Sequence, residues 1–142
     1  MQKRIPLLGL VVCVVTLFGA LISGCTAGER PFEDLTAEGI ADVSIVELPS
    51  NQRTTADSGE IRGLVEILHK VVTYKEDNSH QEMGGQVRII TIVKEDGTET
   101  TVGVFGPYLI IDGIGYKVKN EASELNAWAS RLLYRSGGSF KI

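Results

Sequence analysis

The sequence predicts an α+β domain whose mainly antiparallel sheet, formed by one strand and a later four-stranded meander, has two helices packed on one face. Three observations support this fold class. Residues 87–94 are rich in branched apolar side chains and precede Asp96-Gly97, a dipeptide typical of hairpin turns. Asp57 and Glu60 have the spacing of a helix capping box and precede apolar residues at helical spacing. The order strand, helix, meander, helix favours strands and helices that segregate into layers.

The first strand is expected at residues 40–48, which are rich in branched side chains and partly alternating. Pro49-Ser50-Asn51 closes this strand, because proline and asparagine favour turns. A polar loop is then expected up to Asp57.

The meander starts with the strand at 87–94. Glycine-containing dipeptides separate the strands that follow, because glycine adopts the left-handed backbone of tight turns at little cost. These dipeptides are Asp96-Gly97, Gly106-Pro107 and Asp112-Gly113. The three later strands are expected at 98–105, 108–111 and 114–118.

Two amphipathic helices are predicted. Asp57 caps the first helix, and its apolar stripe comprises Ile61, Leu64, Val65, Leu68, Val71 and Val72. Ser123 is expected to cap the second helix, whose apolar face comprises Leu125, Trp128, Ala129 and Leu132. Between the first helix and the meander, residues 75–85 are polar and end in paired glycines, which predicts an exposed loop.

The chain begins with a positively charged segment, Lys3-Arg4, and an apolar run from 5 to 22. Both features are typical of a secretory signal. The quartet Ile22-Ser23-Gly24-Cys25 resembles the bacterial lipobox, which implies cleavage before Cys25 and a lipid on its sulfur. The domains are then a signal peptide at 1–24, a lipidated tether at 25–31 and one globular domain at 32–142. Pro6, Gly9 and Gly19 weaken the alternative, an uncleaved membrane anchor, which would leave the domain on the same extracytoplasmic face.

The mature chain resembles small lipoproteins of Gram-positive bacteria whose globular domain has no assigned activity. The resemblance is carried by the capped helix, by the Asp96-Gly97-Thr98 hairpin and by two further segments, 31–35 and 110–116. It implies an extracytoplasmic, lipid-anchored protein and brings no catalytic residues with it.

Composition excludes several kinds of site. The chain carries 14 Lys and Arg against 18 Asp and Glu, and loss of Lys3 and Arg4 with the signal brings the net charge to about −6. That charge argues against nucleic acid and against anionic phospholipid as partners. Cys13 leaves with the signal and Cys25 carries the lipid, so no thiol remains for a disulfide, a nucleophile or a metal. We predict no cofactor.

A few residues could nevertheless carry chemistry. Asp77, His80 and Glu82 could together ligate a divalent ion, although a polar loop produces such clusters by composition alone. His69 flanks the apolar stripe of its helix and is expected at the boundary between core and solvent. Residues 94–99 lack the alternating ligands of a calcium loop and are interpreted as a solvated hairpin tip.

Aromatic side chains could form a platform for sugar rings, but packing in the core and at the sheet edge is the favoured interpretation. The aromatic residues concerned are Phe105, Tyr108, Tyr116 and Trp128. Glycine-rich phosphate loops, nucleophile elbows and zinc-binding helix motifs do not occur in the sequence.

The absence of a recognisable catalytic set favours a non-enzymatic binding, sensing or accessory module of the cell envelope. Its partner would be an envelope protein, a peptide or a wall component. One alternative is a small envelope hydrolase or inhibitor-like effector that uses Asp34, Asp112 or the loop around His80. Another is a structural or assembly partner that adds a strand to the exposed edge of the meander.

Overall fold

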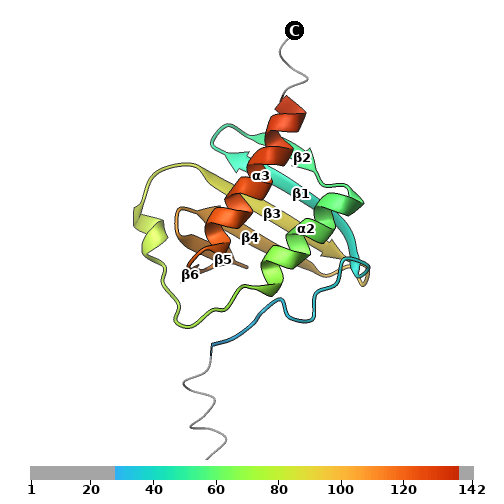
Figure 1. Cartoon of the computed structure of the whole chain (residues 1–142). Helices are drawn as coiled ribbons and strands as arrows, with labels where there is room; N and C mark the ends of the chain where they lie inside the picture. Colours follow the sequence, from blue (N-terminus) through green and yellow to red (C-terminus); the bar gives the residue numbers. More distant parts are fainter. Residues whose placement is uncertain (1–27, 138–142) are drawn as a thin grey trace, which may run out of the picture.

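A computed structural model describes residues 28–137 and contains one six-stranded antiparallel sheet with two α-helices on the same face (Figure 1). The α+β class and the one-sided helix layer are therefore confirmed. The sheet order is β2-β1-β3-β4-β5-β6. Along the chain, the elements are β1 (Ile40–Leu48), β2 (Gln52–Thr55), α2 (Ser58–His69), the 3-10 helix η2 (Ser79–Glu82), β3 (Val87–Lys94), β4 (Glu99–Phe105), β5 (Tyr108–Ile111), β6 (Ile114–Lys117) and α3 (Glu121–Gly137). The predicted signal and Cys25 lie outside the described residues.

The four-stranded meander forms as predicted, from β3 to β6. Its turns use positive backbone φ angles at Gly97 (φ 88°), Gly106 (φ 54°), Asp112 (φ 48°) and Gly113 (φ 90°). Two consecutive positive φ values at Asp112-Gly113 match the primed hairpin turns, whose twist suits the flanking strands.

β2 is a strand that we had predicted as part of a polar loop. It pairs antiparallel with β1, with Ile45 opposite Thr54 and Glu47 opposite Gln52. The turn between the two strands places Asn51 at φ 61° and lets its amide donate to the Glu47 carbonyl at 2.7 Å. The loop prediction was wrong because a short, mostly exposed edge strand needs no apolar alternation.

The capping box at α2 is confirmed. The Glu60 amide donates to Asp57 Oδ1 at 2.8 Å, and the Asp57 amide donates to Glu60 Oε1 at 2.9 Å. The helix ends at His69, so Val71 and Val72 lie beyond it rather than on its stripe. Val71 is nevertheless fully buried, because the chain turns into the core after the helix.

α3 begins at Glu121, two residues before the cap that we had predicted at Ser123. Ser123 lies inside the first turn and is exposed. Ala122 lies in this first turn and is buried. The apolar face of the helix therefore begins three residues before Leu125. The four residues predicted on this face are all buried.

The hydrophobic core lies between the sheet and the two helices. Its fully buried side chains come from both layers, for example Ile45 and Ile90 from the sheet and Leu64 and Leu125 from the helices. Trp128 links the helices, because its indole nitrogen donates to the Glu60 carbonyl at 3.0 Å. Apolar burial of this kind is the main stabilising contribution to the fold.

Residues 28–31 were expected to belong to the tether, but the packed structure already starts within them. The Glu29 amide donates to the Thr73 carbonyl at 2.8 Å, and the Thr73 amide donates back to Glu29 at 2.8 Å. Thr73 is buried and lies four residues after the end of α2 at His69. The point at which the chain enters the domain is therefore held against residues 71–74.

Candidate functional site

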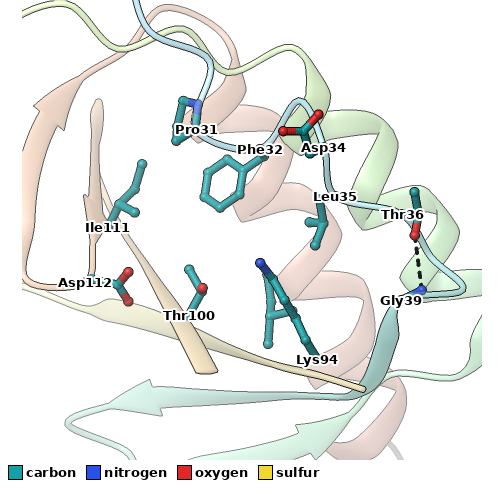
Figure 2. A pocket seen from close by; sticks show the side chains of 11 residues that line it. Pro31, Phe32, Asp34, Leu35, Thr36, Gly39, Lys94, Thr100, Ile111 and Asp112 are labelled. Atoms are coloured by element: carbon teal, nitrogen blue, oxygen red, sulfur yellow. Dashed lines mark hydrogen bonds between the residues drawn. The ribbon is translucent and has the colours of Figure 1, made fainter. Parts of the chain in front are cut away.

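A cavity of about 360 Å³ lies between residues 31–39 and one end of the sheet (Figure 2). Its apolar lining comes from Phe32, Leu35, Ile92 and Ile111. Its polar lining comes from Asp34, Thr36, Lys94, Thr100 and Asp112. Small-molecule sites commonly combine an apolar floor with a few polar groups of this kind.

The segment over the cavity is held to the domain at several points. Phe32 and Leu35 are buried at 5% and 8% exposure, and the Leu35 carbonyl lies 2.6 Å from His69 Nε2. The Gly39 carbonyl accepts a hydrogen bond from the Glu95 amide at 2.9 Å. His69 is otherwise exposed, in agreement with its predicted boundary position.

Lys94 provides the positive charge of the cavity. It is the last residue of β3 and is half-buried. Figure 2 shows its ammonium nitrogen directed toward the Phe32 ring, between Leu35 and Thr100. Within residues 28–137, no carboxylate lies within 4.0 Å of this ammonium. Asp96 lies within electrostatic range of Lys94 but does not form an ion pair with it at this distance, so the ammonium group can still bind an anionic group of a ligand.

Asp34 and Asp112, the carboxylates considered for hydrolysis, both line this cavity but do not converge in it. Asp34 is exposed, and its carboxylate points away from the hollow in Figure 2. Asp112 Oδ1 accepts a hydrogen bond from the Thr101 amide at 2.9 Å, which ties the carboxylate to the hairpin. The geometry therefore does not present the pair of facing carboxylates that acid–base hydrolysis uses.

The loop that holds the weak metal-ligand candidates is organised by hydrogen bonds of its own. Asp77 Oδ1 accepts hydrogen bonds from the Ser79 hydroxyl at 2.5 Å and from the Ser79 amide at 3.1 Å, and these bonds hold the pKa of Asp77 below its ordinary value. In the part of the chain that the structure describes, no three His, Cys, Asp or Glu side chains are arranged to hold a metal ion. Asp77, His80 and Glu82 are thus not brought together.

His80 packs against the sheet instead. Its Nδ1 is buried without a hydrogen-bond partner, and its ring lies 6.1 Å from that of Tyr108. A Cβ at Gly115 would lie 2.6 Å from this nitrogen and would also clash with the Asp77 carbonyl. Glycine at position 115 therefore permits the close approach of this loop to β6.

The residues predicted at the hairpin tip and on the aromatic platform have local roles. Asp96 Oδ1 accepts from the Thr98 amide at 2.9 Å and from its hydroxyl at 2.6 Å, which lowers the pKa of Asp96. Tyr108 and Trp128 are buried at 6% and 2% exposure and cannot stack on a sugar. Phe105 and Tyr116 are half-buried.

Both edges of the sheet are partly covered. At the β6 edge, Gly115 accepts from the Asp77 amide at 2.8 Å and donates to Asn78 Oδ1 at 2.8 Å. At the β2 edge, the Thr55 carbonyl accepts from Arg135 Nη2 at 3.2 Å. Some of the backbone groups that a partner strand would need are therefore already used, and covering an edge in this way discourages edge pairing.

Comparisons with protein-family models, with curated proteins and with solved structures find no match to this chain. Between residues 28 and 137, no helix has the length and hydropathy needed to cross a membrane.

Sequence reasoning identified two of the polar residues in the cavity, Asp34 and Asp112, but missed Lys94. The available signal was its position in the alternating set Arg88, Ile90, Ile92 and Lys94, in which Ile90 and Ile92 are buried under the helices. A lysine that continues a core-facing set is partly withdrawn from water. The cavity itself could not be inferred, because the segment that closes it has no regular structure over 31–39.

Proposed function

We propose that the protein is a non-enzymatic binding module of the bacterial cell envelope, held at the extracytoplasmic face of the membrane by lipid on Cys25. The ligand is a small molecule or peptide end that carries a carboxylate and an apolar group. The observation that carries this proposal is the half-buried Lys94, whose ammonium group faces a partly apolar cavity and has no carboxylate within 4.0 Å among the described residues. The two aspartates at the rim do not converge, which favours binding over hydrolysis.

The size and chemistry of the cavity restrict the ligand. A volume of about 360 Å³ is at the small end of the roughly 300–1,000 Å³ range of ligand pockets. Phe32 and Ile111 offer apolar surface, while the Thr100 hydroxyl offers a neutral hydrogen-bonding group beside Lys94. An acylated amino acid, such as the end of a peptide, has the matching combination of a carboxylate and a small apolar side chain.

Replacing Lys94 by methionine should weaken binding of N-acetylalanine by about 10-fold or more, because a charge-assisted hydrogen bond contributes about 1.5–3 kcal/mol. Methionine keeps a long apolar stem and removes only the charged end. Chemical-shift titration by NMR measures the affinity, with N-acetylalaninamide as the probe without a carboxylate.

Lys75→Met is the matched control, since Lys75 is exposed and does not line the cavity. We expect this variant to bind N-acetylalanine like the parent. Equal affinity of the parent for the acid and the amide, or unchanged binding by Lys94→Met, would contradict a carboxylate site at this lysine.

Replacing Cys25 by alanine should abolish lipid attachment, because alanine has no sulfur to form the thioether. In a bacterial host, the parent should partition into the detergent phase after cell fractionation, and its mass should include the lipid. The Cys25→Ala protein should carry no lipid mass. Lipid on the variant, or none on the parent, would refute the proposed anchor.

A further inference from the structure

We infer that one surface of the domain rests in the phospholipid headgroup layer of the membrane that holds the anchor. This surface consists of Tyr74 with Lys75, Lys117 and Lys119 around it, and we call it the Tyr74 surface. The inference rests on the proposed lipid attachment at Cys25, and it assigns the domain a fixed orientation that the anchor alone does not provide.

The first support is the short distance from the anchor to this surface. The two backbone hydrogen bonds between Glu29 and Thr73, each 2.8 Å long, hold the start of the domain against the segment that carries Tyr74. Glu29 is four positions after Cys25, so the connecting chain spans at most about 14 Å when extended. The headgroup layer is itself roughly 5–8 Å thick. A domain held on so short a chain cannot turn this side far from the membrane.

The second support is the Tyr74 side chain, which is 75% exposed. Its ring lies directly against Gly28, because a Cβ at Gly28 would be 2.7 Å from Tyr74 Cε1. Gly28 is only three residues beyond Cys25. An exposed tyrosine is an amphipathic group that favours the boundary between lipid and water, where the ring is partly dehydrated and the hydroxyl stays hydrated.

The third support is the arrangement of lysines around the tyrosine. Lys117 and Lys119 line the same hollow as Tyr74, a space of about 290 Å³ whose wall includes Val72 and Val118. Within the described ranges, neither lysine lies within 4.0 Å of a carboxylate. Lysine stems lie readily along apolar surface while their ammonium groups reach lipid phosphates.

Carboxylates also lie around this surface, and they limit the role of long-range attraction. Glu76, Asp77 and Glu121 line the two hollows beside Tyr74. The net charge of the chain is also negative. The domain would therefore not seek an anionic membrane on its own. The anchor supplies proximity, and the ring and the lysine–phosphate contacts then select the side that faces the lipid.

The opposite end of the domain supplies a matched control position. In Figure 1, the described chain starts at one side of the domain and the C-terminal end of α3 lies at the other. Tyr134 lies near that end of α3 and is 79% exposed, so it is as accessible as Tyr74. Trp128, the only tryptophan in the chain, is 2% exposed, so it contributes the same background fluorescence to both variants.

The test compares Tyr74→Trp with Tyr134→Trp in the lipid-bearing protein purified from membranes. Each variant is reconstituted into vesicles of phosphatidylcholine and phosphatidylglycerol that contain a lipid with a spin label on its headgroup. We expect the tryptophan at position 74 to be quenched at least about twofold more strongly than the one at position 134, because only the former sits at headgroup depth. Its emission should also shift to shorter wavelength than in the detergent-solubilised protein.

Mass spectrometry of the same samples separates the two proposals. If Cys25 carries lipid but the two positions are quenched equally, or neither is quenched, the orientation is overturned and the anchor stands. If Cys25 carries no lipid, the proposed anchor fails and the orientation fails with it. Near-ultraviolet circular dichroism of both variants checks that the fold is unchanged.

Discussion

Glu47→Ala lowers the free energy of unfolding by about 3–5 kcal/mol, because it leaves a largely buried arginine without its counterion. Arg88 Nε lies 2.9 Å from Glu47 Oε2, and the two side chains are only 16% and 10% exposed. Glu47 in β1 lies directly opposite Arg88 in β3, and both side chains are on the sheet face that the helices cover. Arg88 Nη1 also donates to the side-chain oxygen of Asn126 in α3. Urea denaturation followed by circular dichroism measures the loss.

The double variant Glu47→Leu with Arg88→Met is the control for this prediction. Removing both charges together should restore stability to within about 1–2 kcal/mol of the parent, because no uncompensated charge then remains buried. A double variant as unstable as Glu47→Ala would show that the loss does not come from the unpaired arginine.

Trp128→Ala has the second large effect, a loss of about 3–5 kcal/mol, because it removes the largest side chain of the core and leaves a cavity. Trp128 is 2% exposed, and its indole nitrogen donates to the Glu60 carbonyl in α2. Trp128→Phe retains most of the apolar volume and should cost clearly less. Thermal and urea unfolding of the three proteins give the comparison.

Tyr134→Ala is the matched surface variant on the same helix, since Tyr134 is 79% exposed. Its effect should stay within about 0.5 kcal/mol of the parent. If Trp128→Ala were as stable as Tyr134→Ala, the helix layer would not depend on the indole for its contact between α2 and α3.

The elements predicted best are those that a few neighbouring residues specify. The reciprocal hydrogen bonds of Asp57 and Glu60 require only a spacing of three residues, and they begin α2 where the sequence indicated. The Asp112-Gly113 turn likewise separates β5 from β6 as expected. The start of α3 was predicted less well, because the helix begins at Glu121 and the residue after it, Ala122, is buried in the core.

The elements predicted least well depend on partners far along the chain. β2 is a strand only because β1 offers an unpaired edge, and its own residues are mostly exposed. His80 was expected in an exposed loop, as a weak candidate for a metal ligand, but its Nδ1 is buried beside Gly115 of β6. Neither outcome leaves a local pattern in the sequence.

By itself, the sequence determined the layer architecture, the meander and the face of each helix that is buried, because periodicity and turn chemistry act over a few residues. It also carries the prediction of a lipid on Cys25, which depends on a short motif. Only the tertiary structure decided that Lys94, Asp34 and Asp112 line one cavity and that Tyr74 lies against Gly28. These placements depend on how the irregular segment 28–39 packs across the sheet and the end of α2, and long-range packing of an irregular segment has no sequence period.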